Sequence, residues 1–219
     1  MTKEELARMM DTSLIKIDAT ETELRNFIEK SKKYPFAAVA VDLFYIPLTF
    51  KLLKGTGIPI VAPISYPLGG MTTEAKVYQA EYAVKNGAME MDMSINFAAF
   101  WSRDYDTVRK DIEAVVKVAD GRIVKAVIYV PEMTDEEKVE IAKIARDAGA
   151  RFIKTCCGFG CVTKTRDVRV IKEALGDEIK VMVAGGVRTA KQALAMIEAG
   201  VDRIASSTPF DILEGVETL

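Results

Sequence analysis

The feature of the sequence that most constrains the fold is an alternation of short β-branched runs with longer amphipathic segments, found eight times in 219 residues. This alternation is typical of parallel strands joined by helices. The predicted strands are 11–15, 36–43, 59–64, 88–95, 122–129, 151–155, 179–183 and 202–205. Eight strand–helix units in a chain of this length predict an α/β protein with a closed (β/α)8 TIM barrel, formed by residues 1–219 as a single domain.

The predicted helices have recognisable starts and ends. Three of them begin with a hydroxyl residue followed three positions later by Glu or Gln, which is the capping-box pattern. These pairs are Thr20 with Glu23, Thr134 with Glu137, and Thr189 with Gln192. Glycine is typical of helix ends, and it occurs just before predicted strands at Gly87, Gly149 and Gly200. The alternative, an open doubly wound sheet, lacks support because no Gly-x-Gly-x-x-Gly follows the first strand.

Composition limits the classes of function. Hydrophobic residues make up 49% of the chain and charged residues 28%, and the net charge is -2, which is typical of a globular protein with a sizeable core. Basic and acidic residues alternate at helical spacing, so no basic patch indicates nucleic-acid binding. The first ten residues are too polar for a signal peptide, and no apolar run reaches membrane-spanning length. We therefore expect a cytoplasmic protein that binds neither nucleic acid nor membranes.

The types of residue available restrict the chemistry. The sequence contains no His, and its three cysteines are Cys156, Cys157 and Cys161. Their spacing differs from the Cys-x-x-Cys of zinc sites, so we expect no metal site. Without His there is no Ser-His or Cys-His pair, and proton transfer falls to Asp, Glu, Lys, Tyr or water.

Charged residues inside apolar strands are candidates for a catalytic site. Lys154 lies in the run 151–155, where loss of water disfavours the ammonium and favours the neutral amine that imine chemistry needs. Asp92 and Lys125 lie on adjacent predicted strands, so we expect them to pair across the barrel lumen. Glu90, Ser94 and Asn96 share the face of Asp92. Two alternatives remain: a salt bridge that only fills the barrel, and a Lys154 amine that extends to solvent.

Two turns near the end of the chain indicate an anion site. Gly185 and Gly186 follow the seventh predicted strand, Ser206 and Ser207 follow the eighth, and each turn leads into a helix. Backbone N–H groups at such turns bind phosphate, and barrels commonly hold phosphate after these two strands. Gly-Gly also occurs in turns for steric reasons alone. The pattern favours a small phosphorylated sugar or aldehyde as the ligand.

Together these segments resemble the deoxyribose-phosphate aldolase family over nearly the whole chain. The most specific combination is Phe152-Ile-Lys-Thr155 followed about thirty residues later by Ala184-Gly-Gly-Val-Arg-Thr189. The resemblance implies a class I aldolase that makes or cleaves 2-deoxy-D-ribose 5-phosphate, using acetaldehyde and D-glyceraldehyde 3-phosphate, without metal or organic cofactor. It implies that Lys154 forms the imine and that Asp92 and Lys125 relay protons. It further implies a homodimer or larger assembly, and these substrate-binding residues: Ser13, Gly185, Gly186, Ser206 and Ser207.

The chain departs from the family at several positions expected near the pocket. Met182 replaces a second lysine whose charge favours the neutral form of the imine-forming amine; Lys180, two residues earlier, is the candidate substitute. The other departures are Thr12 for His, Cys156-Cys157 for Ser-Thr, and Ser65-Tyr66 for Gly-Phe. They leave two alternatives: a related aldolase or lyase with another carbonyl donor or sugar, or an inactive barrel that only binds a sugar phosphate.

Overall fold

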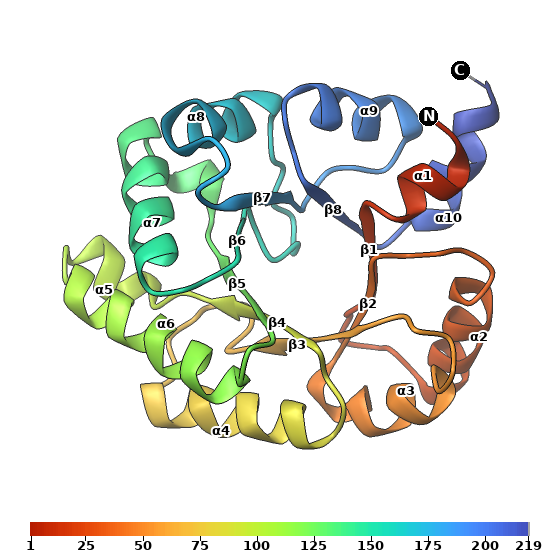
Figure 1. The fold of residues 1–219 in the computed structure, drawn as a ribbon, viewed down its shortest axis with the longest axis horizontal. Helices are drawn as coiled ribbons and strands as arrows, with labels where there is room; N and C mark the ends of the chain where they lie inside the picture. Colours follow the sequence, from red (N-terminus) through yellow and green to blue (C-terminus); the bar gives the residue numbers. More distant parts are fainter. Residues whose placement is uncertain (219) are drawn as a thin grey trace.

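The eight strands form a closed parallel barrel in sequence order, β1 to β8, with β8 pairing back to β1. The computed structural model describes residues 1–218, and Figure 1 shows the strands as an inner ring surrounded by helices. The strands are β1 Met10–Leu14, β2 Ala38–Val41, β3 Ile60–Ile64, β4 Glu90–Ser94, β5 Ile123–Val127, β6 Phe152–Lys154, β7 Lys180–Val183 and β8 Arg203–Ser206. The predicted TIM barrel is thereby confirmed.

The helices follow the strands around the outside of this ring. The α-helices are α1 Lys3–Ala7, α2 Glu21–Ser31, α3 Ile46–Leu52, α4 Thr73–Lys85, α5 Phe97–Trp101, α6 Tyr105–Ala119, α7 Asp135–Asp147, α8 Thr165–Leu175, α9 Ala190–Glu198 and α10 Pro209–Glu214. Short 3-10 helices are η1 Leu43–Tyr45, η2 Val130–Glu132 and η3 Gly215–Thr218. Helix α1 contacts α10, so the two ends of the chain lie side by side (Figure 1). Among residues 1–218, no helix has the length and apolar character needed to cross a bilayer.

Local signals in the sequence explain where these elements begin and end. All three predicted capping boxes form, and the predicted glycines adopt positive φ just after the C-cap residues of α4, α7 and α9. Six of the eight strands are shorter than predicted, whereas β1 and β8 have the predicted length and are shifted by one residue. The second, predicted over 36–43, ends at Val41 because the side chain of Asp42 accepts a hydrogen bond from the backbone N–H of Phe44 and starts η1.

Strand β4 shows how alternation separates the core from the lumen. Met91 and Met93 are fully buried in the large hydrophobic core, whereas Glu90 and Asp92 occupy the opposite face and pair with charged groups inside the barrel. The predicted faces of this strand are thus correct for these residues. Asn96 is an exception: it lies beyond β4, where its side chain accepts a hydrogen bond from Ala99 N and caps α5.

Candidate active site

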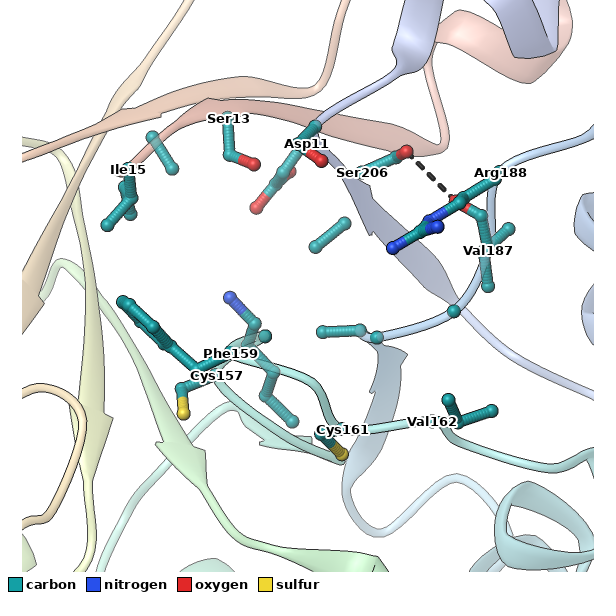
Figure 2. Close-up of a pocket in the computed structure, with 18 of the residues that line it drawn as sticks. Asp11, Ser13, Ile15, Cys157, Phe159, Cys161, Val162, Val187, Arg188 and Ser206 are labelled. Atoms are coloured by element: carbon teal, nitrogen blue, oxygen red, sulfur yellow. Dashed lines mark hydrogen bonds between the residues drawn. The ribbon is translucent and has the colours of Figure 1, made fainter. Parts of the chain in front are cut away.

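The carboxyl ends of the strands surround a cavity of about 470 Å³. Parallel strands place the residues at their carboxyl ends at one rim of the barrel, which is where such barrels hold their ligands. Figure 2 shows Asp11 and Ser13 across the cavity from Cys157 and Phe159. Six of the predicted site residues line this cavity: Ser13, Lys154, Gly185, Gly186, Ser206 and Ser207.

Lys154 is the last residue of β6, and its side chain is held at the cavity floor. Only 5% of the residue is exposed. Its Nζ donates to Asp92 Oδ2 at 2.5 Å and to the Tyr66 hydroxyl at 3.2 Å. The amine is therefore buried, directed by a carboxylate, and open to the cavity; the alternative of a Lys154 amine that extends to solvent is wrong.

Asp92 and Lys125 do not line the cavity; they lie in the buried charge network next to Lys154. Their Cα atoms are register partners on β4 and β5, and Lys125 Nζ lies 3.2 Å from Asp92 Oδ1, so the predicted pairing is correct. Lys125 also lies 2.5 Å from Asp11 and 2.8 Å from Glu90. Arg203 contacts Asp11 at 3.2 Å and Glu90 at 2.6 Å. Three carboxylates thus face three cations, Lys125, Lys154 and Arg203.

This network sets the protonation states inside the barrel. Burial opposes ionisation of Asp92, but Lys125 and Lys154 outweigh it and lower the Asp92 pKa to about 2. Burial likewise opposes the charge on Lys125, but Asp11, Asp92 and Glu90 outweigh it and raise the Lys125 pKa. For Asp11 burial outweighs the attraction of Lys125 and Arg203, so the Asp11 pKa is raised. Asp92 is therefore ionised beside Lys154, and Lys125 stays charged.

Lys180 does not substitute for the lysine that Met182 replaces. It is the exposed first residue of β7, its register partner is Phe152, and its Nζ lies 5.8 Å from the Phe152 ring centroid. Met182 is the register partner of Lys154 and is fully buried. Two residues of strand, about 6–7 Å, separate Lys180 from that level of the barrel. The expectation that Lys180 takes the missing place is wrong because its strand position directs it to the opposite rim.

The other departures differ in how they reach the cavity. Tyr66 and Cys157 line it, whereas Thr12 does not, because the alternation of β1 turns Asp11 and Ser13 inward and Thr12 outward. Cys156 is fully buried and does not line the cavity. Its buried thiol donates to Ala184 O at 3.2 Å. The substituted residues therefore lie near the pocket as expected, but only Tyr66 and Cys157 line it.

The β7 and β8 turns form one end of the cavity. Gly185 and Gly186 have φ values of +82° and +85°, and a Cβ on Gly185 would lie 2.6 Å from Cys156 Sγ. The Ser206 hydroxyl donates to Val187 O at 3.0 Å (Figure 2) and accepts from Thr208 N at 3.1 Å, which ties the two turns together. The turn after β7 therefore requires glycine at positions 185 and 186, and the Ser206 hydroxyl is held by hydrogen bonds within the protein.

Sequence reasoning assigned no role to four residues of this region: Asp11, Tyr66, Arg188 and Arg203. Asp11 and Ser13 share a strand face, a signal that was present in the sequence. Arg188 follows the Gly-Gly turn, and its guanidinium points toward the cavity in Figure 2. The contacts of Arg203 with Glu90 and of Tyr66 with Asp92 had no local signal, because the partners are distant in sequence.

Within residues 1–218, no group of three or more His, Cys, Asp or Glu side chains is arranged to hold a metal ion. The cavity's charged and polar groups instead include an amine, the carboxylate of Asp11, a phenol, hydroxyls and a guanidinium. These groups suit a polar small molecule that carries a carbonyl and an anionic end.

The fold and the site together define a barrel aldolase, a carbon–carbon lyase, and comparison with known proteins gives the family. The chain belongs to the DeoC/LacD aldolase family, whose model matches residues 3–211. A deoxyribose-phosphate aldolase of Enterococcus faecalis is 42% identical over 213 residues, covering 96% of this chain and 97% of that protein.

Solved structures agree with this assignment. A structure titled "QR15, an Aldolase" superposes with a TM-score of 0.93 at 32% identity, covering 98% of this chain and 96% of that one. A deoxyribose phosphate aldolase from Aeropyrum pernix, described as tetrameric, has a TM-score of 0.93 at 26% identity, covering 99% of this chain and 93% of that one.

Proposed function

We propose that this aldolase interconverts 2-deoxy-D-ribose 5-phosphate with acetaldehyde and D-glyceraldehyde 3-phosphate, through an imine on Lys154. The observation that carries the proposal is the buried Lys154 amine, 2.5 Å from Asp92 and open to a cavity with a Gly-Gly turn at one end. Relatives named deoxyribose-phosphate aldolase, such as the 42% identical protein of Enterococcus faecalis, support the choice of substrate.

The first half of the proposed reaction uses the Lys154–Asp92 pair. Asp92 takes a proton from the ammonium, and the free electron pair of Nζ attacks the carbonyl carbon of the sugar. The carbinolamine then loses water to give a protonated imine, which draws electrons from the neighbouring carbon–carbon bond. Cleavage of that bond, with transfer of the β-hydroxyl proton to Asp92, releases the phosphorylated aldehyde and leaves an enamine on Lys154.

The second half returns the enzyme to its starting state. Asp92 and Lys125 relay a proton to the enamine carbon, and hydrolysis of the resulting imine frees acetaldehyde. Lys125 is suited to hold Asp92 in place because it also binds Asp11 and Glu90 and stays charged. Ser13, which lines the cavity, is proposed to contact a substrate hydroxyl.

The phosphate is proposed to bind at the β7 and β8 turns. Gly185, Gly186, Ser206 and Ser207 present backbone N–H groups there, and Arg188 adds a positive charge at the same end of the cavity. We further propose a single-domain cytoplasmic enzyme that forms a homodimer or larger homo-oligomer. The tetrameric description of the Aeropyrum pernix structure supports an oligomer.

Reductive trapping tests the imine directly. Incubation with acetaldehyde and borohydride is expected to add one ethyl group per chain, located at Lys154 by intact-mass and peptide analysis, because the reduced imine is a stable secondary amine. Cleavage of 2-deoxy-D-ribose 5-phosphate is expected in the same preparation. If Lys154 carries no ethyl group after this treatment, the proposed chemistry is rejected.

A substitution in the Gly-Gly turn tests the phosphate site. Gly185→Ala is expected to raise KM for the phosphorylated sugar at least about 10-fold, because its Cβ would meet Cys156 Sγ and Cys161 O at 2.6 Å and shift the turn. Rates with unphosphorylated deoxyribose should change little. Gly57→Ala is the matched control: it has a φ of +75° but nothing within 4 Å of the new Cβ. Equal effects on both sugars would place the phosphate elsewhere.

A second candidate substrate class is favoured by Met182. This apolar side chain, on the register partner of Lys154, stands where the family resemblance implies a second, charged lysine. The site therefore also suits a ketone or a larger aldehyde as the donor. Trapping with a panel of aldehydes and ketones separates the two candidates, since the preferred donor gives the fastest adduct. Turnover of any of them excludes a barrel that only binds sugar phosphate.

A further inference from the structure

Tyr66 places a phenol between the two groups that begin the proposed reaction. Its hydroxyl accepts a hydrogen bond from Lys154 Nζ at 3.2 Å and donates one to Asp92 Oδ2 at 3.3 Å. Tyr66 also lines the cavity, where a carbonyl compound bonded to Lys154 would lie. One oxygen atom therefore contacts the reacting nitrogen, its carboxylate partner and the substrate space.

The turn that carries Tyr66 is fixed by several backbone contacts. Ser65 has a φ of 57°, its N–H donates to Gln79 Oε1 at 2.8 Å, and its carbonyl accepts from Gly69 N at 2.8 Å. Gly69 lies so close to the end of β4 that a Cβ there would come 1.7 Å from the carbonyl oxygen of Ile95, the residue after this strand. The phenol is thus held on a rigid turn against the strand that carries Asp92, and a preorganised donor of this kind is effective in catalysis.

The protonation states make Tyr66 a donor. Burial and the neighbouring Asp92 carboxylate raise the Tyr66 pKa well above 10, so the phenol keeps its proton at neutral pH. Lys125 is bound by three carboxylates, and Met182, the register partner of Lys154, has no proton to give. Among the side chains that contact Lys154 Nζ, Tyr66 is the neutral acid.

Loss of water from the carbinolamine is the step that needs such an acid. Hydroxide is a poor leaving group, so the oxygen must gain a proton as the carbon–oxygen bond breaks. The attraction of Lys154 that helps to lower the Asp92 pKa is lost when the amine becomes neutral, so Asp92 can hold the proton that Lys154 released. The hydrogen-bond partner of Asp92 on the way to the cavity is the Tyr66 hydroxyl. A proton can pass from Asp92 to the substrate through this oxygen.

We propose that Tyr66 is a catalytic residue of this enzyme, which protonates the leaving hydroxyl of the carbinolamine and is reprotonated by Asp92. The proposal rests on the proposed imine chemistry at Lys154. In the step, the nitrogen electron pair forms the C=N bond, the C–O bond breaks, and the phenol proton makes the leaving group water. Asp92 then returns its proton to the phenolate. The sum is ammonium plus carbonyl giving iminium plus water, with Asp92 and Tyr66 unchanged.

Rapid-quench trapping measures this step. Tyr66→Phe removes only the hydroxyl, and it is expected to slow the appearance of the borohydride-trapped ethyl adduct from acetaldehyde by about 10²-fold or more. The final amount of adduct should equal that of the wild type, because a proton shuttle changes the rate and not the equilibrium. Tyr78→Phe is the matched control, because Tyr78 lies on α4 and is 70% exposed. In this variant the trapped adduct should form at the wild-type rate.

A buffer titration separates proton transfer from a structural effect. In Tyr66→Phe the trapping rate should rise with the concentration of imidazole buffer at constant pH and ionic strength, because a small acid replaces the missing phenol, whereas the wild-type rate should not respond. The role of Tyr66 would be overturned if Tyr66→Phe formed the adduct at the wild-type rate. It would also be overturned if adduct formation in this variant were slow, did not speed up with added buffer and ended at a lower final amount of adduct. Absence of adduct in the wild-type enzyme would instead reject the imine chemistry itself.

Discussion

Replacing Lys154 with leucine is expected to abolish aldol cleavage, lowering kcat by at least about 10⁴-fold. The reason is chemical. Without the Nζ nucleophile no imine forms, and the remaining groups around the cavity offer no other electron sink for the carbon–carbon bond. Leucine fills most of the space of the lysine stem, so the barrel should still fold. Asp92 keeps Lys125 as a partner at 3.2 Å in the variant.

The measurement combines turnover, trapping and stability. Cleavage of 2-deoxy-D-ribose 5-phosphate and the borohydride-dependent mass increase should both disappear in Lys154→Leu, while the cooperative unfolding transition persists. Lys180→Leu is the matched control, because it removes an exposed lysine from the opposite rim of the barrel and should retain activity. Substantial turnover in folded Lys154→Leu would show that another residue carries the chemistry.

The fold could be predicted from the sequence because its signals are local. Strand and helix alternation is read from hydrophobic periodicity, and the capping boxes at Thr20, Thr134 and Thr189 depend on residues only three positions apart. The ends of strands were less predictable. At Asp42 a side-chain hydrogen bond to Phe44 N ends the pairing of β2, although the run remains apolar beyond it.

The contacts of the candidate site could be predicted where they join residues at the same level of neighbouring strands. Asp92 and Lys125 are such a pair, and alternation along β4 and β5 was enough to bring them together. The contact of Asp11 with Lys125 joins residues 114 positions apart across the lumen, and only closure of the barrel creates it. Tyr66 was expected near the pocket, but its contacts could not be predicted, because the direction of its side chain depends on the turn after β3 rather than on the strand.

Lys125→Met is expected to lower the free energy of unfolding at pH 7 by about 3–5 kcal/mol and to impair turnover. Lys125 is fully buried, and its removal leaves Asp11, Glu90 and Asp92 with only Arg203 and Lys154 as counter-charges. Buried carboxylates that lose a partner have neither water nor a cation to stabilise them. Denaturant unfolding of the variant measures the loss. Lys16→Met, which removes an exposed ion pair with Glu23, is the control and should behave like the wild type.

The pH dependence of this loss identifies its origin. The Asp92 pKa lies near 2 in the folded protein, below the ordinary value of about 3.9, so its ion pairs stabilise the fold above pH 4 and that stabilisation is lost as pH falls toward 2. The difference between wild type and Lys125→Met should therefore be largest near neutral pH and shrink in acid, where the carboxylates of the variant are protonated. Adding Asp11→Asn to Lys125→Met should recover part of the stability at pH 7, because one uncompensated charge is removed. A loss independent of pH, with no recovery in the double variant, would mean that Lys125 stabilises the barrel through its packed methylene chain instead of its charge.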